Sequence, residues 1–479
     1  MGEREAALRH AELAARQLAE GAHGAAFESL ASALQLAPEM AELWTQFADL
    51  IRYFNLRHPV PPRVRELLAR ALEHPAVDPG NLVRPVTTLA LSRPDPLGEP
   101  LLLRLMEDVV IRDAALERLI TDTRRRMLDE DLPLPVMNAI AQQCFNTEYV
   151  FEETEAERAR IPDELDGERA RLRYGAYRPL KEMLRAEEER RLAAEIPSMS
   201  GAQTAVSAKV QAQYEENPYP RWVRTQSVFS PATISGMPAA PRILVAGCGT
   251  GQHAIQTARR FAGAKVLAVD ISRASLAYAQ RKTRELGIEN IEYRQADILA
   301  LGALGERFDL IDSSGVLHHL EDPFEGWRVL ASLRKPGGLM RIGLYSAAGR
   351  RPVARARELI AAEGFTADAA GIRACRAAIR ARADDPLLAA IARNEDFYSM
   401  SGCRDLLFHV HEVCFSLPQI EAMIARLGLR FLGFEFPDSG QTLARYRARF
   451  ADPADLKSWH HFEAEHPETF ARMYQFWVT

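Results

Sequence analysis

The 479-residue chain has few cysteines, no long apolar run and no excess of positive charge. Its five cysteines include no Cys-x-x-Cys pair and no spacing typical of metal ligands, so we expect reduced thiols and no metal site. No stretch approaches the roughly 18 apolar residues of a membrane span. The charged first residues also lack the apolar core of a secretion signal. These absences predict a cytoplasmic protein with no membrane partner.

Charge and composition exclude further classes. The 60 basic and 65 acidic residues give a formal net charge of −5, which argues against a nucleic-acid partner. A chain that is 47% hydrophobic and 26% charged has an ordinary globular composition. Its length is too great for one ordinary domain and indicates two or three.

A glycine-rich turn is the most informative motif present. Residues 243–246 form an apolar run typical of a buried parallel strand, and Gly247, Gly249 and Gly251 follow it directly. Glycines let a ligand lie against backbone N–H groups with no side chain in between. Two further apolar strands, over 266–269 and 291–296, end in Asp270 and Asp297. This ordered set predicts a nucleoside-binding edge of a parallel sheet.

These residues resemble the class I S-adenosylmethionine-dependent methyltransferases, closely over residues 240–346 and loosely over the last sixty. The resemblance implies a Rossmann-like α/β domain with a mostly parallel seven-stranded sheet and helices on both faces. It implies that the three glycines hold the methionine end of S-adenosylmethionine, that Asp270 binds the ribose, and that Asp297 with Ile298 holds the adenine. Three further candidates for cofactor binding are Cys248, Ile271 and Ser313.

One position departs from the family pattern. The family usually has an acid two residues before the first glycine, and Val245 stands there instead. The segment 214–222 contains two prolines, three aromatic residues and an arginine just ahead of the first strand. We expect it to fold over the cofactor edge, where Tyr214 or Glu215 meets the methionine ammonium. Substrate-binding candidates in this segment are Tyr219, Arg221 and Trp222. The alternative is an aromatic and proline plug that packs two domains.

The rival reading of the glycine turn is a dinucleotide oxidoreductase, whose fingerprint is Gly-x-Gly-x-x-Gly. Position 252 is glutamine in this chain, and an acid after the third strand suits an adenine without a second nucleotide. The motif therefore favours the methyltransferase.

Histidines supply the candidates for proton transfer. His318 follows the fourth strand, and an imidazole suits the task of a general base if one is used. His319 packs the following helix or faces the substrate, and Tyr345 at the end of the fifth strand is a second catalytic candidate. His409 and His411, in a helical insertion over about 347–415, are predicted to face the substrate. Two histidines and one acid are too few for a metal site.

The domains follow from composition. Residues 1–150 predict an all-α domain, in which 25–38 and 41–50 resemble one tetratricopeptide-repeat unit. Residues 151–235 are expected to form a helical linker with the aromatic and proline segment, and 236–479 the methyltransferase domain, ending in an antiparallel pair of strands. The first domain either recruits a partner or caps the second domain or a homodimer.

The resulting hypothesis is a methyltransferase whose acceptor is a peptide or protein, or else a small molecule. The alternative is a non-catalytic helical interaction protein that senses S-adenosylmethionine. The intact glycines and acids favour the enzyme.

Overall fold

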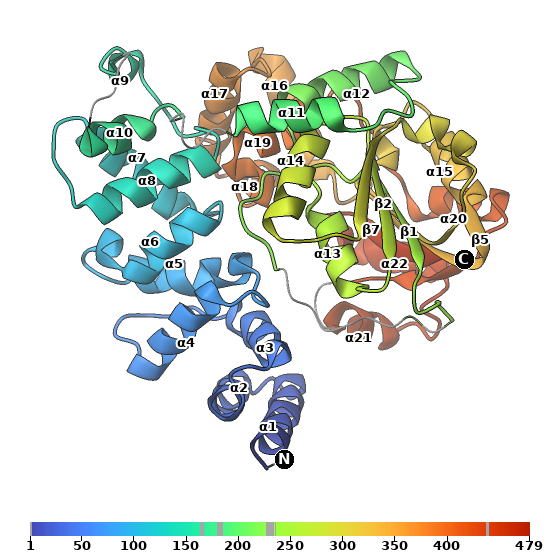
Figure 1. The fold of residues 1–479 in the computed structure, drawn as a ribbon, viewed down its shortest axis with the longest axis horizontal. Helices are drawn as coiled ribbons and strands as arrows, with labels where there is room; N and C mark the ends of the chain where they lie inside the picture. Colours follow the sequence, from blue (N-terminus) through green and yellow to red (C-terminus); the bar gives the residue numbers. More distant parts are fainter. Residues whose placement is uncertain (1, 163–166, 180–184, 227–233, 235, 437–439) are drawn as a thin grey trace. The chain divides into compact units, whose positions relative to one another are not determined.

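The computed structural model describes residues 2–162, 167–179, 185–226, 234, 236–436 and 440–479 (Figure 1). These residues belong to two compact units. The first unit comprises residues 1–184 with the short segments 221–231 and 397–400; the second comprises 185–220, 232–396 and 401–479. No helix in the described ranges combines the length and the apolar composition that a membrane crossing requires.

The first unit contains helices and no strand among its described residues. Its α-helices are α1 (Gly2–Ala19), α2 (His23–Leu36), α3 (Ala41–Ile51), α4 (Pro62–Glu73), α5 (Val83–Leu91), α6 (Pro100–Asp108), α7 (Ala114–Arg126), α8 (Leu134–Asn146), α9 (Glu155–Arg158) and α10 (Glu168–Gly175). Helix α3 buries Leu43, Phe47 and Leu50, whose spacing of three to four residues gives one apolar face. The two helices predicted around Pro38 are thus present as α2 and α3, while the tetratricopeptide repeat stays a prediction.

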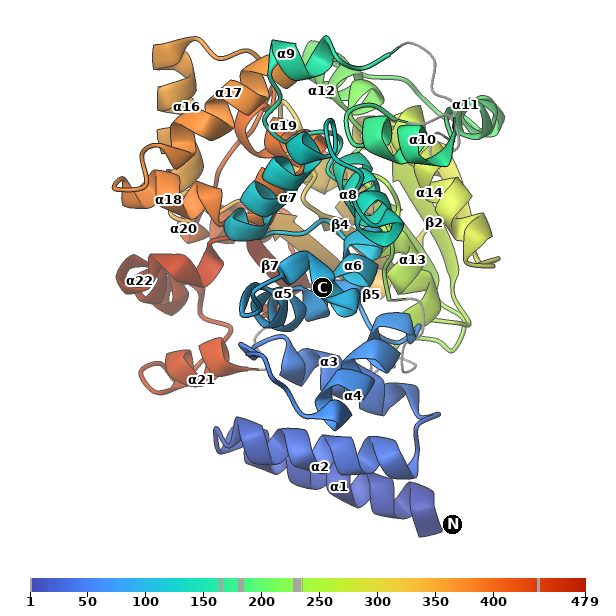
Figure 2. The ribbon, with the colours of Figure 1, turned by 90° about the vertical axis from the view of Figure 1, so that its left-hand side faces the viewer.

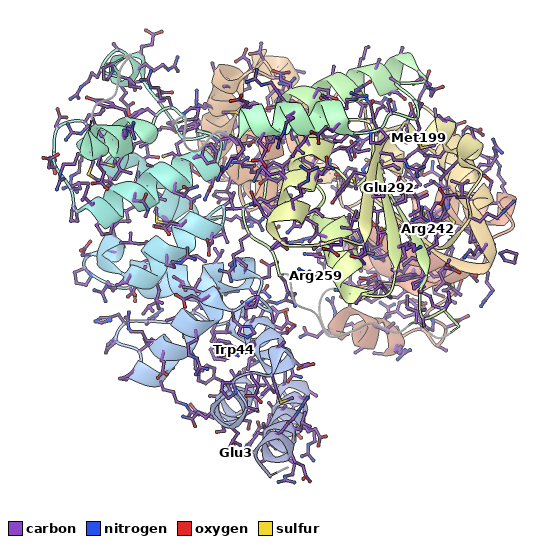
Figure 3. All side chains as sticks on the ribbon, viewed as in Figure 1. Glu3, Trp44, Met199, Arg242, Arg259 and Glu292 are labelled. Atoms are coloured by element: carbon purple, nitrogen blue, oxygen red, sulfur yellow. The ribbon has the colours of Figure 1, made fainter. Side chains whose placement is uncertain are left out.

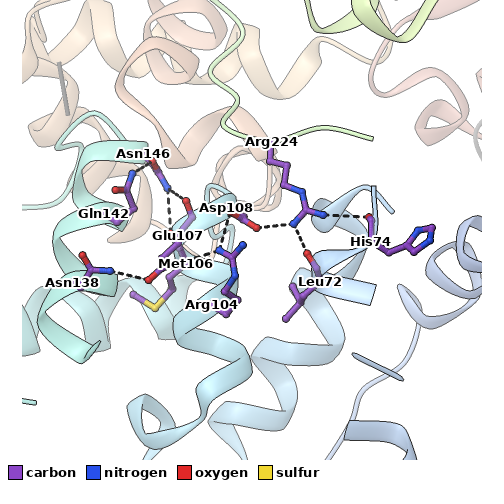
Figure 4. A network of polar contacts seen from close by, with 10 residues as sticks. All are labelled: Leu72, His74, Arg104, Met106, Glu107, Asp108, Asn138, Gln142, Asn146 and Arg224. Atoms are coloured by element: carbon purple, nitrogen blue, oxygen red, sulfur yellow. Dashed lines mark hydrogen bonds and ion pairs between the residues drawn. The ribbon is translucent and has the colours of Figure 1, made fainter. Parts of the chain in front are cut away.

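A polar network joins helix ends inside the first unit (Figure 4). The guanidinium of Arg224 donates to the carboxylate of Asp108 at 2.8 Å and to the carbonyl oxygens of Leu72 and His74. The side chain of Asn146 donates to the carbonyl oxygens of Met106 and Glu107. Carbonyl groups at the ends of α4 and α6 are therefore satisfied by side chains.

The second unit is built on one seven-stranded sheet. The strand order is β3-β2-β1-β4-β5-β7-β6. Strands β1 to β5 pair in parallel, and β7 pairs antiparallel with both β5 and β6. The strands are β1 (Arg242–Ala246), β2 (Lys265–Asp270), β3 (Ile291–Gln295), β4 (Phe308–Ser314), β5 (Arg334–Leu344), β6 (Phe431–Phe434) and β7 (Tyr474–Val478). This confirms the predicted mostly parallel, seven-stranded sheet.

The other described elements of the second unit include twelve α-helices, some of which pack against the sheet. They are α11 (Ala186–Glu195), α12 (Ala205–Glu216), α13 (Gln252–Arg260), α14 (Arg273–Glu285), α15 (Pro323–Ser332), α16 (Arg351–Glu363), α17 (Ala369–Arg380), α18 (Pro386–Ala392), α19 (Met400–Phe408), α20 (Leu417–Arg426), α21 (Gln441–Arg447) and α22 (Leu456–Glu465). Helices α13 and α14 pack against β2, and α15 packs against β5. Helices α16, α17 and α18 of the predicted insertion gather on one another in both views (Figures 1 and 2).

The outer edge of β3 is partly covered by the segment that precedes α12. The N–H of Met199 donates to the carbonyl of Gln295 at 2.9 Å, and the N–H of Gln295 donates to the carbonyl of Pro197 at 2.8 Å. Figure 3 labels Met199 of this segment and Glu292 of β3. Pairing at this edge fixes the chain that leads into α12, which lines the cavity described next.

Candidate functional site

The second unit contains a cavity of about 270 Å³. It lies where the carboxyl ends of β1, β2 and β4 meet, the usual ligand position in open α/β sheets. Eleven of the residues predicted from sequence line it: Tyr214, Tyr219, Gly247, Cys248, Gly249, Asp270, Ile271, Asp297, Ile298, His319 and Tyr345. Seven do not: Arg221, Trp222, Gly251, Ser313, His318, His409 and His411. The edge predicted from three strand ends therefore coincides with a cavity.

The glycines are required by packing as well as by access. All three have positive φ, at 77° for Gly247, 50° for Gly249 and 83° for Gly251. A Cβ on Gly249 would lie 2.5 Å from the carbonyl oxygen of Tyr219. A Cβ on Gly251 would lie 2.5 Å from the Cβ of Ala279 in α14. Gly247 and Gly249 face the cavity, whereas Gly251 begins α13 and serves helix packing.

The two predicted acids are fixed by backbone N–H groups. Asp270 accepts from the N–H of Gly249 at 2.8 Å and from the N–H of Ser272 at 2.9 Å. Burial outweighs these hydrogen bonds and raises the pKa of Asp270 to about 6. Asp297 accepts from the N–H groups of Leu299 and Gln203. The fixed carboxylates stand at the ends of neighbouring strands, as a bound nucleoside requires.

The end of α12 and the residues after it form one wall of the cavity. The N–H of Thr250 donates to the carbonyl of Tyr219 at 3.2 Å, and its hydroxyl donates to the carbonyl of Pro220 at 2.7 Å. The carboxylate of Glu215 accepts from the N–H groups of Arg273 and Ala274 at the start of α14. Glu215 is therefore committed to capping a helix, which leaves Tyr214 as the cavity-lining member of the predicted pair.

Two predicted substrate residues belong to the first unit instead. The guanidinium of Arg221 lies over the ring of Phe145, 5.1 Å from its centroid. Trp222 is buried, at 6% exposure. Sequence proximity to Tyr219 suggested a shared role, but the chain passes from one unit to the other between Pro220 and Arg221.

A chain of hydrogen bonds reaches the cavity from α19. The hydroxyl of Tyr214 donates to Asp405 at 2.7 Å and lies 3.1 Å from Nε2 of His409. Nδ1 of His409 accepts from the N–H of His411 at 3.1 Å, so its Nε2 carries the hydrogen and donates to Tyr214. Burial raises the pKa of Asp405 and lowers that of His409 to about 4. Asp405 lines the cavity and was missed from sequence, where only its place in the insertion signalled it.

The structure places the two adjacent histidines in different surroundings. His319 lines the cavity, and its Nδ1 donates to the carbonyl of His411 at 2.9 Å, so Nε2 keeps its lone pair. His318 is fully buried and stacks on Tyr345 at 3.8 Å between ring centroids. Successive side chains in a 3-10 turn point about 120° apart, and both residues lie in such a turn (Leu317–His319). Of the two histidines, His319 and not the predicted His318 lines the cavity, and the use of a general base stays a prediction.

The grouping of His319, Asp405 and His409 does not fit a metal ion. Their potential ligand atoms lie within 4.8 Å of one another. However, the rings of His319 and His409 stack at 3.7 Å with an interplanar angle of 20°, so their in-plane lone pairs run side by side and do not converge. His409 also presents an N–H at Nε2. Asp405 and His409 are instead joined through the hydroxyl of Tyr214, and His319 stacks on His409. His411 donates through Nε2 to the carbonyl of Leu320 and lies outside the cavity lining.

Comparison with known proteins agrees with the sequence resemblance. Residues 243–338 match a protein-family model described as a methyltransferase domain. An uncharacterized protein of Synechococcus sp. is 34% identical over 210 residues, which cover 42% of this chain and 50% of that protein. The ubiquinone biosynthesis O-methyltransferase of Dinoroseobacter shibae is 36% identical over 134 residues, covering 28% of this chain and 50% of that protein. The chain thus spans about half the length of the curated relatives it matches.

One solved structure is similar over about half of each chain. The structure of PKMT2 from Rickettsia typhi in complex with AdoHcy has a TM-score of 0.41 and 17% sequence identity, and covers 50% of this chain and 49% of that one. Residues 243–338 are therefore similar to a methyltransferase domain.

Proposed function

We propose that this chain, whose residues 243–338 form a methyltransferase domain, transfers a methyl group from S-adenosylmethionine to an acceptor that binds beside His319 and Asp405. The observation that carries the proposal is the cavity at the carboxyl ends of the strands, because it brings glycines, acids and a neutral histidine together. S-adenosylmethionine supplies the activated methyl group when bound.

The cofactor residues divide by strand. Gly247 and Gly249 let the ligand approach the backbone after β1, and Cys248 and Ile271 add apolar walls. Asp270 offers its carboxylate to the ribose hydroxyls after β2. Asp297 and Ile298 hold the adenine after β3. These residues fit the cofactor because they lie around one cavity with both carboxylates already oriented.

The end of the cavity where the methyl acceptor would bind carries side-chain groups that accept hydrogen bonds. Nε2 of His319 keeps a lone pair, and burial next to His409 lowers the pKa of His319 to about 3, so the ring stays neutral at pH 7. The carboxylate of Asp405 stands beside it. An acceptor therefore presents an O–H or N–H group there, and the neutral ring of His319 accepts a hydrogen bond from it and orients it for methyl transfer. Tyr345 forms a wall of this end.

The helical first unit favours a peptide or protein that carries such a group, because helical repeat-like units present extended binding surfaces. The named O-methyltransferase relatives favour a small hydroxyl compound as the second candidate.

The test is formation of S-adenosylhomocysteine by the full chain with peptides that contain Ser, Lys or His, and in parallel with a catechol. We expect turnover with one class and none by the Asp270→Ala variant. Binding of S-adenosylmethionine without turnover on either class would favour the non-catalytic sensor.

A further inference from the structure

An acid stands beside the position where the sequence lacks one. In the parallel pairing of β1 with β4, Val245 is opposite Asp312. Paired residues of neighbouring parallel strands project to the same face of a sheet. Asp312 is 3% exposed, and a buried carboxylate is costly unless it has partners and a role.

Three side chains surround this carboxylate. Oδ2 of Asp312 lies 2.7 Å from Nε2 of His253 and 3.3 Å from the guanidinium of Arg341, and the hydroxyl of Ser314 donates to Oδ1. Burial alone would raise the pKa of Asp312, but His253 and then Arg341 lower it to about 2. Arg341 is held in turn by Glu435 at 2.8 Å. The carboxylate is therefore ionised and fixed toward His253.

His253 carries this arrangement to the cavity. It lies in the first turn of α13, directly after the glycine turn, and lines the cavity with Gln252, Gly247 and Ser314. Its side chain is 41% exposed, in contrast to Asp312. Because Nε2 is directed at Asp312, the opposite ring nitrogen, Nδ1, is the one left for a ligand.

We propose that His253, oriented by Asp312, binds the amino-acid end of the cofactor and replaces the acid that is missing at Val245. The Asp312 carboxylate polarises the imidazole, so Nδ1 accepts an N–H of the methionine ammonium. His253 contacts the ligand, and Asp312 is a positioning residue. The proposal rests on the proposed function and names the residues that hold one end of its cofactor.

The test compares two ligands by calorimetric titration of the full chain. S-adenosylhomocysteine contains the amino-acid group, whereas 5′-methylthioadenosine keeps the adenosine and the sulfur but lacks that group. We expect His253→Ala and Asp312→Asn to weaken S-adenosylhomocysteine by roughly tenfold to a hundredfold, as for a lost hydrogen bond to a charged group. Both variants should leave the affinity for 5′-methylthioadenosine unchanged, which a general disturbance of the fold would not.

Asp309→Asn is the matched control, because Asp309 is on the same strand and pairs with Lys335 away from the cavity lining. This variant should bind both ligands as the parent does. Equal loss of both ligands, or no loss of either, in the two site variants would overturn the inference while the proposed function stands. Failure of the parent chain to bind S-adenosylhomocysteine would instead overturn the proposed function. If Asp312→Asn does not fold, His253→Ala decides alone.

Discussion

Most residues of the proposed cofactor site lie directly after the ends of strands, and backbone N–H groups orient the two acids among them. Asp270 is the clearest example, since its carboxylate accepts hydrogen bonds from the N–H of Gly249 in the glycine turn and from the N–H of Ser272 after β2. Its position was predictable because a side chain that follows a buried parallel strand must emerge at the carboxyl edge of the sheet.

Replacing Asp270 with Ala tests this residue. The change removes the proposed partner of the ribose and leaves the N–H groups of Gly249 and Ser272 without their acceptor. We expect the affinity for S-adenosylmethionine to fall at least about tenfold, since hydrogen bonds to a charged group are lost. Titration calorimetry measures it. Glu306→Gln, which changes an ion pair with Arg242 at the amino end of β1, is the control, and unchanged binding by Asp270→Ala would refute the assignment.

The adjacent histidines give a matched pair for testing how the methyl acceptor is oriented. His319→Gln removes the lone pair that faces the cavity, and we expect kcat to fall roughly a hundredfold because the acceptor loses its orientation. His318→Gln changes a buried ring outside the lining and should lower kcat much less, although it costs stability. Steady-state rates with the same acceptor compare them. A larger loss in the His318 variant would restore the original sequence prediction.

The positions of these two histidines show what the sequence cannot reveal. The glycines and acids follow strands, whose side-chain directions have a period of two, whereas the histidines lie in a short 3-10 turn whose orientation depends on its packing. Asp405 was missed for a related reason. Its helix face is set by how the insertion folds back on the sheet, and no local pattern encodes that.

At the level of structural elements, buried neutral histidines lie in two segments, one after the carboxyl end of β4 and one at the end of α19. Burial lowers the pKa of His318 well below its usual value, that of His319 to about 3 and that of His409 to about 4. The unfolded chain therefore binds protons below about pH 6.5 that the folded chain does not. Asp270, with its pKa raised to about 6, and Asp405, with its raised pKa, oppose this effect in part.

This arrangement predicts that acid destabilises the second unit. As the pH falls from the unfolded to the folded pKa of such a histidine, the free energy of unfolding decreases by about 1.4 kcal/mol per pH unit. Stability therefore falls from pH 6.5 toward pH 4. Thermal unfolding followed at pH 7, 6 and 5 measures the slope. His409→Gln should reduce that slope by about one proton. A melting temperature that does not change with pH would contradict the buried, neutral state of these rings.

Element boundaries show the same division between local and distant causes. The first three strands were located closely because each is a short run with glycine or aspartate at or just after its end; β1 and β2 are also apolar, whereas β3 contains charged residues. Strand β5 begins at Arg334, ahead of the apolar residues that start at Leu339, because its first residue pairs with Phe308 through an irregular register that the apolar pattern does not show.

For the whole molecule, the proposed division of labour is that the second unit binds the cofactor and the first presents the acceptor. Removing residues 1–150 should spare the affinity for S-adenosylmethionine while lowering kcat/KM for a peptide acceptor. Rates at subsaturating peptide check this prediction, with a small catechol as the comparison substrate. Equal turnover of the peptide by the truncated and full chains would remove the recruiting role.

The most direct test of the central claim is calorimetric titration of the full chain with S-adenosylmethionine and, separately, with NADPH. The cavity with its two fixed carboxylates and its Gly-x-Gly-x-Gly turn predicts binding of S-adenosylmethionine at about micromolar affinity and no binding of NADPH. Binding of NADPH alone, or of neither ligand, would contradict the assignment of this cavity to a methyl donor.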